Sequence, residues 1–211
     1  MDFRYAIFDM DGTLIDSIPY WDRLVPEFLR GFGIEATAKL NQEMSAMSMQ
    51  ECGLWLKERF ELRSSAEDIV HALCRDIGRH YAEDILLKPG VKEYLTYLKR
   101  QGIRMCVATA SSVELGRPAL ERNGILSCFD FLVDCGMVGV GKSSPAVYHL
   151  AAEKFGTQAS ECVVAEDSAY ALKTAKKAGF QTIGVYERSE PDQETVRTYS
   201  DRYVKSFTEL L

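Results

Sequence analysis

The sequence has no long apolar run, no excess of basic residues and no internal repeat. No stretch approaches the roughly 20 apolar residues of a membrane-spanning helix, and the polar opening 1–4 with the short apolar run after it does not resemble a signal peptide. Lys and Arg number 25 against 31 Asp and Glu, and the formal net charge of −6 argues against a nucleic-acid or anionic-membrane surface. We therefore expect a cytoplasmic protein without a nucleic-acid or membrane partner.

Sequence signals of cross-linking are also missing, since none of the six cysteines belongs to a CxxC pair. Most of them lie in apolar runs, where a free thiol behaves as a small hydrophobic side chain. Buried, reduced cysteines therefore explain the sequence better than a disulfide framework or a zinc site. A chain of 211 residues with 46% apolar residues can bury a sizeable core without such cross-links.

Short apolar runs that end at polar residues predict the strands of a sheet. These runs are Tyr5–Phe8, Arg104–Ala108, Phe131–Val133, Cys162–Ala165 and Thr182–Val185. Runs of this length are typical of parallel strands that are covered on both faces. Helical patterns lie between them, so the sequence predicts an α/β fold with an open parallel sheet.

Two helix starts follow from local signals. Ser144 is expected to be the N-cap of a helix that has Pro145 in its first position. Gly116 and Pro118 are expected to break or kink any helix in the stretch 111–124, which leaves the start of that helix open.

The segment 16–86 interrupts the alternation of strands and helices, because its apolar residues show helical spacing only. Its helical patterns are Trp21–Arg30, Met49–Phe60 and Ala66–Tyr81. We therefore expect a helical domain of residues 16–86, inserted into a sheet domain of residues 1–15 and 87–211. Trp21 at helical spacing is expected to pack inside this insertion rather than to line a substrate pocket.

Two aspartates follow the first predicted strand. Asp9 and Asp11 are spaced i, i+2, so their carboxylates point to the same side as the chain leaves the strand, and Gly12 permits a sharp turn. Solvated acids in a turn would explain one Asp before a glycine, but not a second one at the end of a buried apolar run. The pair is therefore a candidate for chemistry at the carboxyl edge of the sheet, where open α/β sheets bind ligands.

Three further polar clusters lie at or just past predicted strand ends. Thr109-Ala110-Ser111 offers a hydroxyl and backbone N–H groups that can hold phosphoryl oxygens, although Ser and Thr are also routine helix caps. Lys142 precedes a helix N-terminus, where a cation is poorly placed unless an anion shares the site, and a solvated loop lysine is an equal alternative. Glu166 and Asp167 can cap the next helix, bind a hard divalent cation, or do both.

Taken together, these clusters imply a metal. A site with Asp9, Asp11, Glu166 and Asp167 carries up to four negative charges, of which Lys142 offsets one. A phosphate dianion would be repelled unless a divalent cation entered. Mg²⁺ fits a set of oxygen ligands combined with a substrate phosphate.

The same residues resemble the haloacid dehalogenase-like superfamily of phosphotransferases. DMDGTLIDS at 9–17 resembles its first motif, Thr109 its second, Lys142 its third and Glu166-Asp167 its fourth, in the same order and spacing. The resemblance covers essentially the whole chain, and the insertion is similar to the helical cap of the subfamily of β-phosphoglucomutase and phosphoglycolate phosphatase. It implies a Rossmann-like catalytic core with an inserted α-helical cap. We expect a monomer that acts on a small phosphorylated metabolite.

The resemblance also implies the roles of the catalytic residues. Asp9 is expected to be the nucleophile that forms an aspartyl-phosphate. Asp11 is expected to protonate the leaving oxygen and then to activate water. Thr109 and the backbone N–H of Ala110 are expected to bind the phosphoryl oxygens, and Lys142 to bridge the phosphate and the nucleophile.

The metal ligands implied by the resemblance are oxygen atoms. Mg²⁺ is expected to be held by the carboxylates of Asp9 and Asp167 and by the backbone carbonyl of Asp11. Glu166 is either a direct ligand or a residue that holds another ligand in place.

Departures from the family pattern distinguish between activities. The dehalogenases of the superfamily lack the second acid of the first motif, which is present here as Asp11. Mutase-like members carry a His early in the cap and an Arg in a later cap loop, whereas Trp21 stands where that His would align and 44–50 contains no Arg. Ala146 replaces an acid of the third motif, with little expected effect because the lysine is kept. A Mg²⁺-dependent phosphatase is therefore the expected activity. A sugar-phosphate mutase and a non-catalytic sensor of a phosphorylated ligand are its alternatives.

Overall fold

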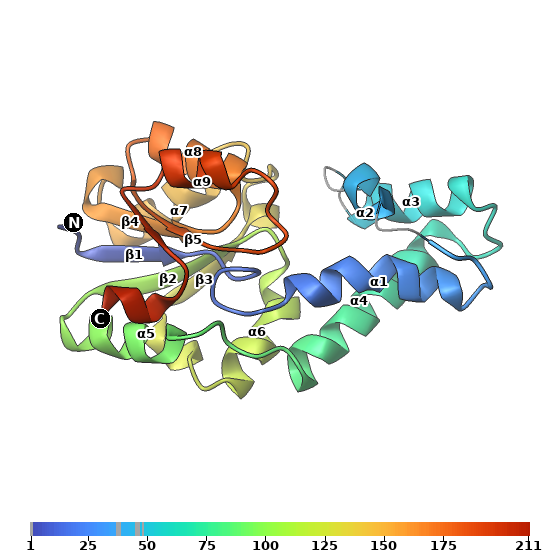
Figure 1. The fold of residues 1–211 in the computed structure, drawn as a ribbon, viewed down its shortest axis with the longest axis horizontal. Coiled ribbons are helices and arrows are strands. Elements are labelled where there is room, and N and C mark those ends of the chain that lie inside the picture. Colours follow the sequence, from blue (N-terminus) through green and yellow to red (C-terminus); the bar gives the residue numbers. More distant parts are fainter. Residues whose placement is uncertain (1, 37–38, 45–46, 48) are drawn as a thin grey trace. The chain divides into compact units, whose positions relative to one another are not determined.

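A computed structural model describes residues 2–36, 39–44, 47 and 49–211, and the chain divides into two compact units (Figure 1). We call Met1–Asp16 together with Ile85–Leu211 the sheet unit, and Ser17–Asp84 the helical unit. All six cysteines are free. Within the described residues, no helix combines the length and the apolar character that crossing a bilayer requires.

The sheet unit is built on six parallel strands, which confirms the predicted α/β fold. In chain order they are β1 Tyr5–Phe8, β2 Arg104–Thr109, β3 Phe131–Asp134, β4 Cys162–Glu166, β5 Gln181–Val185 and β6 Arg202–Val204. Their order across the sheet is β3-β2-β1-β4-β5-β6, and each neighbouring pair is parallel. The strand order reverses between β1 and β4, which is the point where open sheets of this kind bind ligands.

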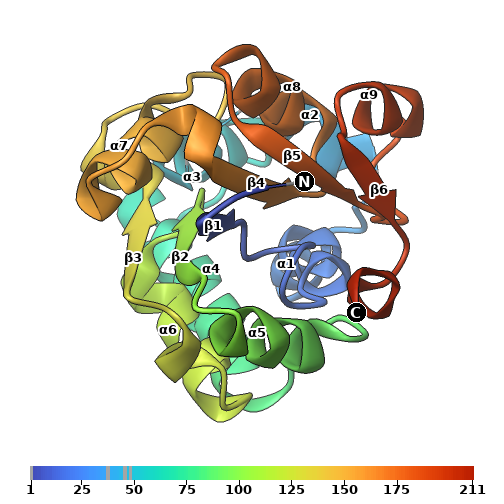
Figure 2. The ribbon, with the colours of Figure 1, turned by 90° about the vertical axis from the view of Figure 1, so that its left-hand side faces the viewer.

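Helices cover both faces of this sheet, with α7 and α8 on one face and α5 and α6 on the other (Figure 2). The helices are α5 Val91–Arg100, α6 Val113–Arg122, α7 Ala146–Phe155, α8 Ala169–Lys177 and α9 Gln193–Thr198. Short 3₁₀ turns, η1 Leu126–Cys128, η2 Cys135–Met137, η3 Ala159–Glu161 and η4 Phe207–Leu210, complete the unit.

Two consecutive residues of β1 show why this strand consists of apolar residues throughout. Ile7 belongs to a buried cluster with Tyr148 of α7. Phe8 points to the opposite face, where its ring lies 6.4 Å from that of Tyr94 and 6.2 Å from that of Phe207, measured between centroids. Successive side chains of a strand face opposite sides, so a strand covered twice needs apolar residues at both positions.

The helical unit consists of α1 Ile18–Arg30, α2 Lys39–Met44, α3 Met49–Arg59 and α4 Ala66–Glu83. Helix α4 packs against both α1 and α3. Trp21 of α1 donates a hydrogen bond from Nε1 to the hydroxyl oxygen of Tyr81, at 3.1 Å, and the two rings meet edge to face. Trp21 therefore packs within this unit.

Two helices differ from what the local sequence signals predict. Helix α6 continues from Val113 to Arg122 although it contains Gly116 and Pro118. A Cβ on Gly116 would lie 2.2 Å from Cε of Met10, so the glycine lets the helix approach that side chain, and packing outweighs the low helix propensity. Helix α7 begins one residue later than expected. Pro145 takes the cap position, and the side chain of Ser144, one residue earlier, accepts from the backbone N–H of Ala146 at 3.4 Å.

Candidate active site

The register of the sheet brings the ends of β1, β2 and β4 to one edge. Phe8 pairs with Val107 of β2 and with Ala165 of β4. The pairing extends one step further, because the backbone N–H of Asp9 donates to the carbonyl oxygen of Ala165 at 3.0 Å. Asp9 thus leaves the sheet beside Glu166, and its side chain is buried.

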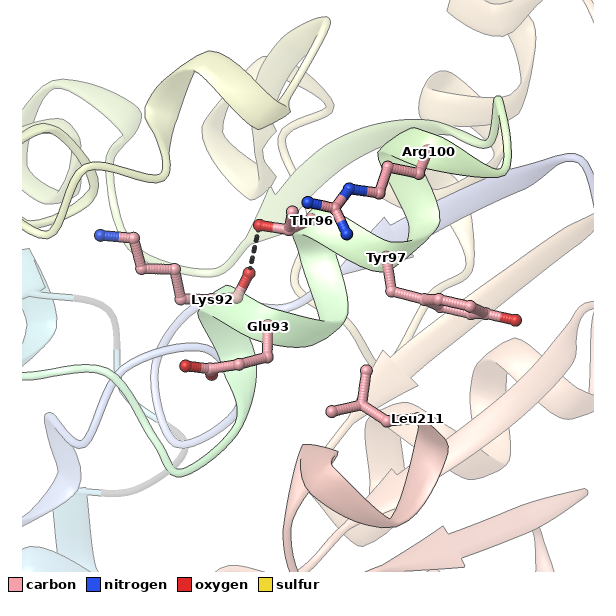
Figure 3. Close-up of a pocket in the computed structure, with 6 residues that line it drawn as sticks. All are labelled: Lys92, Glu93, Thr96, Tyr97, Arg100 and Leu211. Atoms are coloured by element: carbon pink, nitrogen blue, oxygen red, sulfur yellow. Dashed lines mark hydrogen bonds between the residues drawn. The ribbon is translucent and has the colours of Figure 1, made fainter.

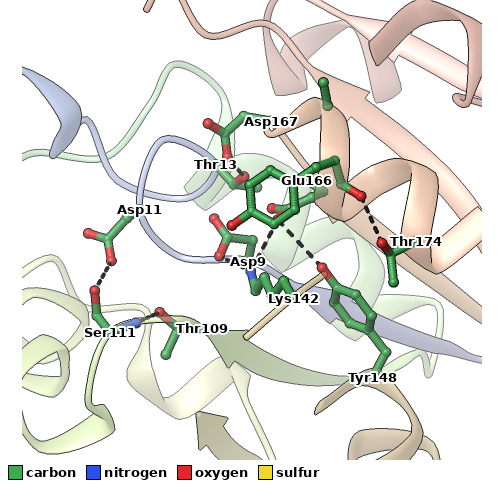
Figure 4. A network of polar contacts seen from close by, with 12 residues as sticks. Asp9, Asp11, Thr13, Thr109, Ser111, Lys142, Tyr148, Glu166, Asp167 and Thr174 are labelled. Atoms are coloured by element: carbon green, nitrogen blue, oxygen red, sulfur yellow. Dashed lines mark hydrogen bonds and ion pairs between the residues drawn. The ribbon is translucent and has the colours of Figure 1, made fainter. Parts of the chain in front are cut away.

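The loop after β1 is fixed by its own backbone and by a side chain from the turn after β4. Gly12 has a φ of 84°, in the left-handed region that favours glycine, and its N–H donates to the carbonyl oxygen of Ile15 at 3.0 Å. The Thr13 hydroxyl donates to Oδ1 of Asp167 at 2.8 Å (Figure 4). The loop is therefore tied to the turn that follows β4.

Lys142 lies between two of the buried carboxylates. Its Nζ donates to Oδ1 of Asp9, and to Oε1 of Glu166 at 3.2 Å (Figure 4). Burial alone would lower the pKa of Lys142, but the carboxylates of Asp9 and Glu166 raise that pKa well above its ordinary value. Nζ also lies 5.8 Å from the centre of the Tyr148 ring. Lys142 is thus held as an ammonium ion, and the site contains a buried positive charge.

Three buried carboxylates nevertheless outnumber this one ammonium group. Asp9, Glu166 and Asp167 each offer an oxygen within 4.8 Å of the others. Burial, followed by the charge of Asp9, raises the pKa of Asp167 to about 8 and raises that of Glu166 well above its ordinary value. Within the part of the chain that the structure describes, Oε2 of Glu166 is buried without a hydrogen-bond partner. The donor set is made of hard carboxylate oxygen atoms, one of which has no hydrogen-bond partner, so it fits a Mg²⁺ ion.

Asp11 and Thr109 are linked through a third residue. The hydroxyl of Ser111 donates to Oδ2 of Asp11 at 2.8 Å, and the backbone N–H of Ser111 donates to Oγ1 of Thr109 at 3.1 Å (Figure 4). Thr109 is buried, Asp11 is half-buried and Ala110 is exposed. The turn after β2 therefore presents a hydroxyl, an exposed backbone segment and a partner for the second aspartate.

Three residues that contact this region had no role in the sequence analysis. Thr13 binds Asp167, and Tyr148 lies under Lys142 with its hydroxyl 3.5 Å from Oε1 of Glu166. Asp134 accepts from the backbone N–H of Val113 at 2.9 Å and so holds the start of α6. Asp134 could have been found, because it also follows an apolar run. Tyr148 gave no signal, since its helical spacing is that of any core residue.

A separate hollow lies on α5 and is lined by none of the predicted site residues. It encloses about 480 Å³ and is lined by Lys92, Glu93, Thr96, Tyr97, Arg100 and Leu211 (Figure 3). The Thr96 hydroxyl is engaged within the helix, where it donates to the carbonyl oxygen of Lys92 at 2.7 Å. This hollow lacks the buried, charged groups that distinguish the edge of the sheet.

The chain is similar in sequence and in fold to known hydrolases and phosphatases. Residues 3–179 match the family described as haloacid dehalogenase-like hydrolase. A phosphorylated carbohydrates phosphatase of Thermotoga maritima is 29% identical over 178 residues, which cover 84% of this chain and 82% of the relative. Hexitol phosphatase B of Escherichia coli K12 is 28% identical over 207 residues, covering 97% and 93%. A crystal structure of CbbY from Rhodobacter sphaeroides in complex with xylulose-(1,5)-bisphosphate has a TM-score of 0.83 and 25% identity, covering 99% and 96%.

Proposed function

The chain belongs to the haloacid dehalogenase-like hydrolase family, and we propose that it is a Mg²⁺-dependent phosphatase that hydrolyses a small phosphorylated carbohydrate. The observation that carries this proposal is the buried contact between Lys142 and Asp9, inside a group of three carboxylates. A nucleophilic carboxylate beside an ammonium group suits the transfer of a phosphoryl group, because the ammonium stabilises the negative charge on the phosphoryl oxygens during the transfer.

The first half of the reaction forms an ester with the enzyme. An oxygen of Asp9 attacks the phosphorus, and the bond from phosphorus to the leaving oxygen breaks. Asp11 gives its proton to that leaving oxygen, so the alcohol departs neutral. Thr109, the backbone N–H of Ala110 and the ammonium of Lys142 bind the phosphoryl oxygens throughout the transfer.

The second half returns Asp9 to its starting state. Asp11, now a carboxylate, takes a proton from a water molecule, and the resulting hydroxide attacks the phosphorus. The bond between phosphorus and the Asp9 oxygen breaks, and inorganic phosphate is released. The same aspartate thus acts first as an acid and then as a base.

Mg²⁺ would be held by the carboxylates of Asp9 and Asp167 and by the backbone carbonyl of Asp11, with Glu166 as a further ligand or as the partner of one. When bound, the ion neutralises part of the negative charge of the acids and binds the substrate phosphate. The Thr13 hydroxyl orients Asp167 through its hydrogen bond.

The substrate class rests on the relatives, two of which are named as phosphatases of phosphorylated carbohydrates and of hexitols. The packing of Trp21 against Tyr81 supports a phosphatase over a sugar-phosphate mutase, because an indole in the place of the mutase histidine cannot exchange protons with a sugar.

The test is a screen of phosphorylated sugars, sugar alcohols and other small phosphomonoesters with Mg²⁺, measuring inorganic phosphate. We expect release with at least one phosphorylated carbohydrate, and none from Asp9→Asn. No release from any phosphomonoester would contradict the phosphatase. Efficient conversion of β-glucose 1-phosphate to glucose 6-phosphate would replace it with the mutase.

A further inference from the structure

Ser111 lies in the turn between β2 and α6. It has two hydrogen-bond donors, and each of them binds a residue of a different motif. Its hydroxyl binds Oδ2 of Asp11 at 2.8 Å, and its backbone N–H binds Oγ1 of Thr109 at 3.1 Å (Figure 4). The two partners come from the ends of β1 and β2, which lie side by side in the sheet. Ser111 is therefore the link between the proposed acid and base and the proposed phosphoryl-binding turn.

The turn that carries Ser111 is held on both sides by residues other than Asp11. Thr109 ends a buried strand and fixes the turn on one side. Asp134 at the end of β3 fixes it on the other side, by accepting from the backbone N–H of Val113 at 2.9 Å. A hydroxyl anchored in this way can direct a neighbouring carboxylate, because its own backbone is held.

The carboxyl group of Asp11 depends more on a neighbouring group for its orientation than that of Asp9 does. Asp9 is buried and its Oδ1 accepts from Lys142, whereas Asp11 is half-buried and lies outside the group of three carboxylates. The last torsion of an aspartate side chain is broad, so the carboxyl group turns easily unless a partner holds it. Proton transfer requires the acid within hydrogen-bond reach of the leaving oxygen.

We propose that Ser111 is a positioning residue for Asp11. Its hydroxyl holds Oδ2 and so fixes the direction of the carboxyl group that exchanges protons with the leaving oxygen and with water. This inference rests on the proposed function, because it concerns the residue proposed as its acid and base. It predicts that removing the hydroxyl slows proton transfer and leaves the binding of phosphate intact.

The experiment compares an alkyl phosphate, the best carbohydrate substrate of the screen, with p-nitrophenyl phosphate. The alkyl phosphate needs its leaving oxygen protonated, and nitrophenolate leaves without a proton. For Ser111→Ala we expect kcat on the alkyl phosphate to fall on the order of tenfold, a part of the roughly 10²–10⁴-fold that acid–base catalysis contributes. KM should stay within a factor of about two. The first burst of nitrophenol should keep its rate, while steady turnover falls, because hydrolysis of the aspartyl-phosphate still needs the base.

The neighbouring Ser112 supplies the matched control. It is exposed, and its side chain makes no cap hydrogen bond to α6, so Ser112→Ala should behave as the wild type. Ser111→Thr keeps the hydroxyl and should restore most of the turnover. Ser111→Gly also removes the hydroxyl and takes the place of Ser111→Ala if that variant does not fold by melting temperature.

The outcomes separate this inference from the proposed function. A wild-type enzyme that hydrolyses no phosphomonoester contradicts the phosphatase itself. Turnover of Ser111→Ala equal to that of the wild type overturns the positioning role alone. A loss of the nitrophenol burst, or a rise in KM with kcat unchanged, also overturns it, because Ser111 would then act on phosphoryl transfer or on binding.

Discussion

The two units of the chain bury different kinds of side chain. Around the carboxyl edge of the sheet unit, the buried residues include Asp9, Thr109, Lys142, Glu166 and Asp167. In the helical unit, the buried side chains within the described residues are hydrophobic, apart from Ser17 at its border with the sheet unit. Burying charged groups costs free energy, and clustering carboxylates costs more. A fold that keeps such a cluster at one edge of the sheet loses stability there. The cluster is therefore better explained by a catalytic role than by a role in packing.

The helical unit illustrates the opposite arrangement. Leu56, Ile69, Leu73 and Ile77 are buried where α4 meets its neighbours. Gly53 lets α3 approach α4 closely, because a Cβ there would lie 2.8 Å from the carbonyl oxygen of Ala66. Substitutions in this unit should therefore act on folding, and substitutions at the sheet edge should act on turnover.

The largest effect is expected from Asp9→Asn. The amide has nearly the same shape as the carboxylate but cannot act as the nucleophile, so turnover should fall to background while the melting temperature shows a folded protein. Rapid-quench kinetics and intact-protein mass spectrometry should find neither a product burst nor a phosphoryl adduct. Asp130→Asn, at an exposed acid of the same unit that pairs with Arg104, is the control and should keep full turnover. An adduct on Asp9→Asn would show that another residue is the nucleophile.

The next effect is expected from removal of the metal. Chelation with EDTA should abolish turnover and added Mg²⁺ should restore it, because Lys142 offsets only one of the three clustered carboxylates. Turnover by a preparation shown to be metal-free by elemental analysis would refute the metal assignment.

The metal-free protein should also show a pH-dependent stability that originates at this edge. The folded-state pKa of Asp167 is raised to about 8 from the reference value of 3.8, so folding favours its protonated form. The stability that this group contributes is fully present below about pH 4 and is lost as the pH rises toward 8. Denaturant titrations between pH 5 and 8 should show the free energy of unfolding falling with pH, and Asp167→Asn should reduce the slope. An unchanged slope in that variant would assign the dependence to other groups.

A smaller effect, on folding alone, is expected from Leu73→Ala in the helical unit. Leu73 is 1% exposed, and truncating a buried leucine typically costs about 2–5 kcal/mol because it leaves a cavity. Urea titration should show this loss, whereas calorimetric titration of the folded protein should give an unchanged affinity for Mg²⁺. A weakened affinity would contradict the division between the two units.

The fold could be predicted to a large extent because its signals are local. The apolar runs of β1, β2 and β4 and the polar residues at their ends identify the strands and the edge at which the motifs meet. The 3-residue strand β6, Arg202-Tyr203-Val204, has no apolar run and was not predicted. Helix α6 was predicted to break or kink because propensity was weighed without the packing of Met10 on Gly116.

Side-chain contacts at the site were less accessible to sequence reasoning. The strand ends place the motifs at one edge, but they do not tell which atoms meet. The bond from Thr13 to Asp167 joins residues 154 positions apart, and that from Ser111 to Asp11 joins residues 100 positions apart. Both depend on the direction in which a loop turns, which follows from the whole sheet and not from neighbouring residues. The catalytic roles of these residues stay predictions until the variants are measured.

The smallest predicted effect concerns a helix cap of the helical unit. The side chain of Ser65 accepts from the backbone N–H of Asp68 at 3.0 Å and so satisfies one of the unpaired N–H groups at the start of α4. Ser65→Ala should lower the free energy of unfolding by about 1 kcal/mol, as is typical for the loss of an N-cap. Ser65→Asp keeps an acceptor at this position and should retain most of the stability, and Ser64→Ala, next to the cap, is the matched control. Urea titration of the three variants measures the free energy of unfolding, and turnover by the folded enzyme should not change. A loss of turnover in Ser65→Ala with its stability intact would mean that the helical unit contributes to chemistry as well as to folding.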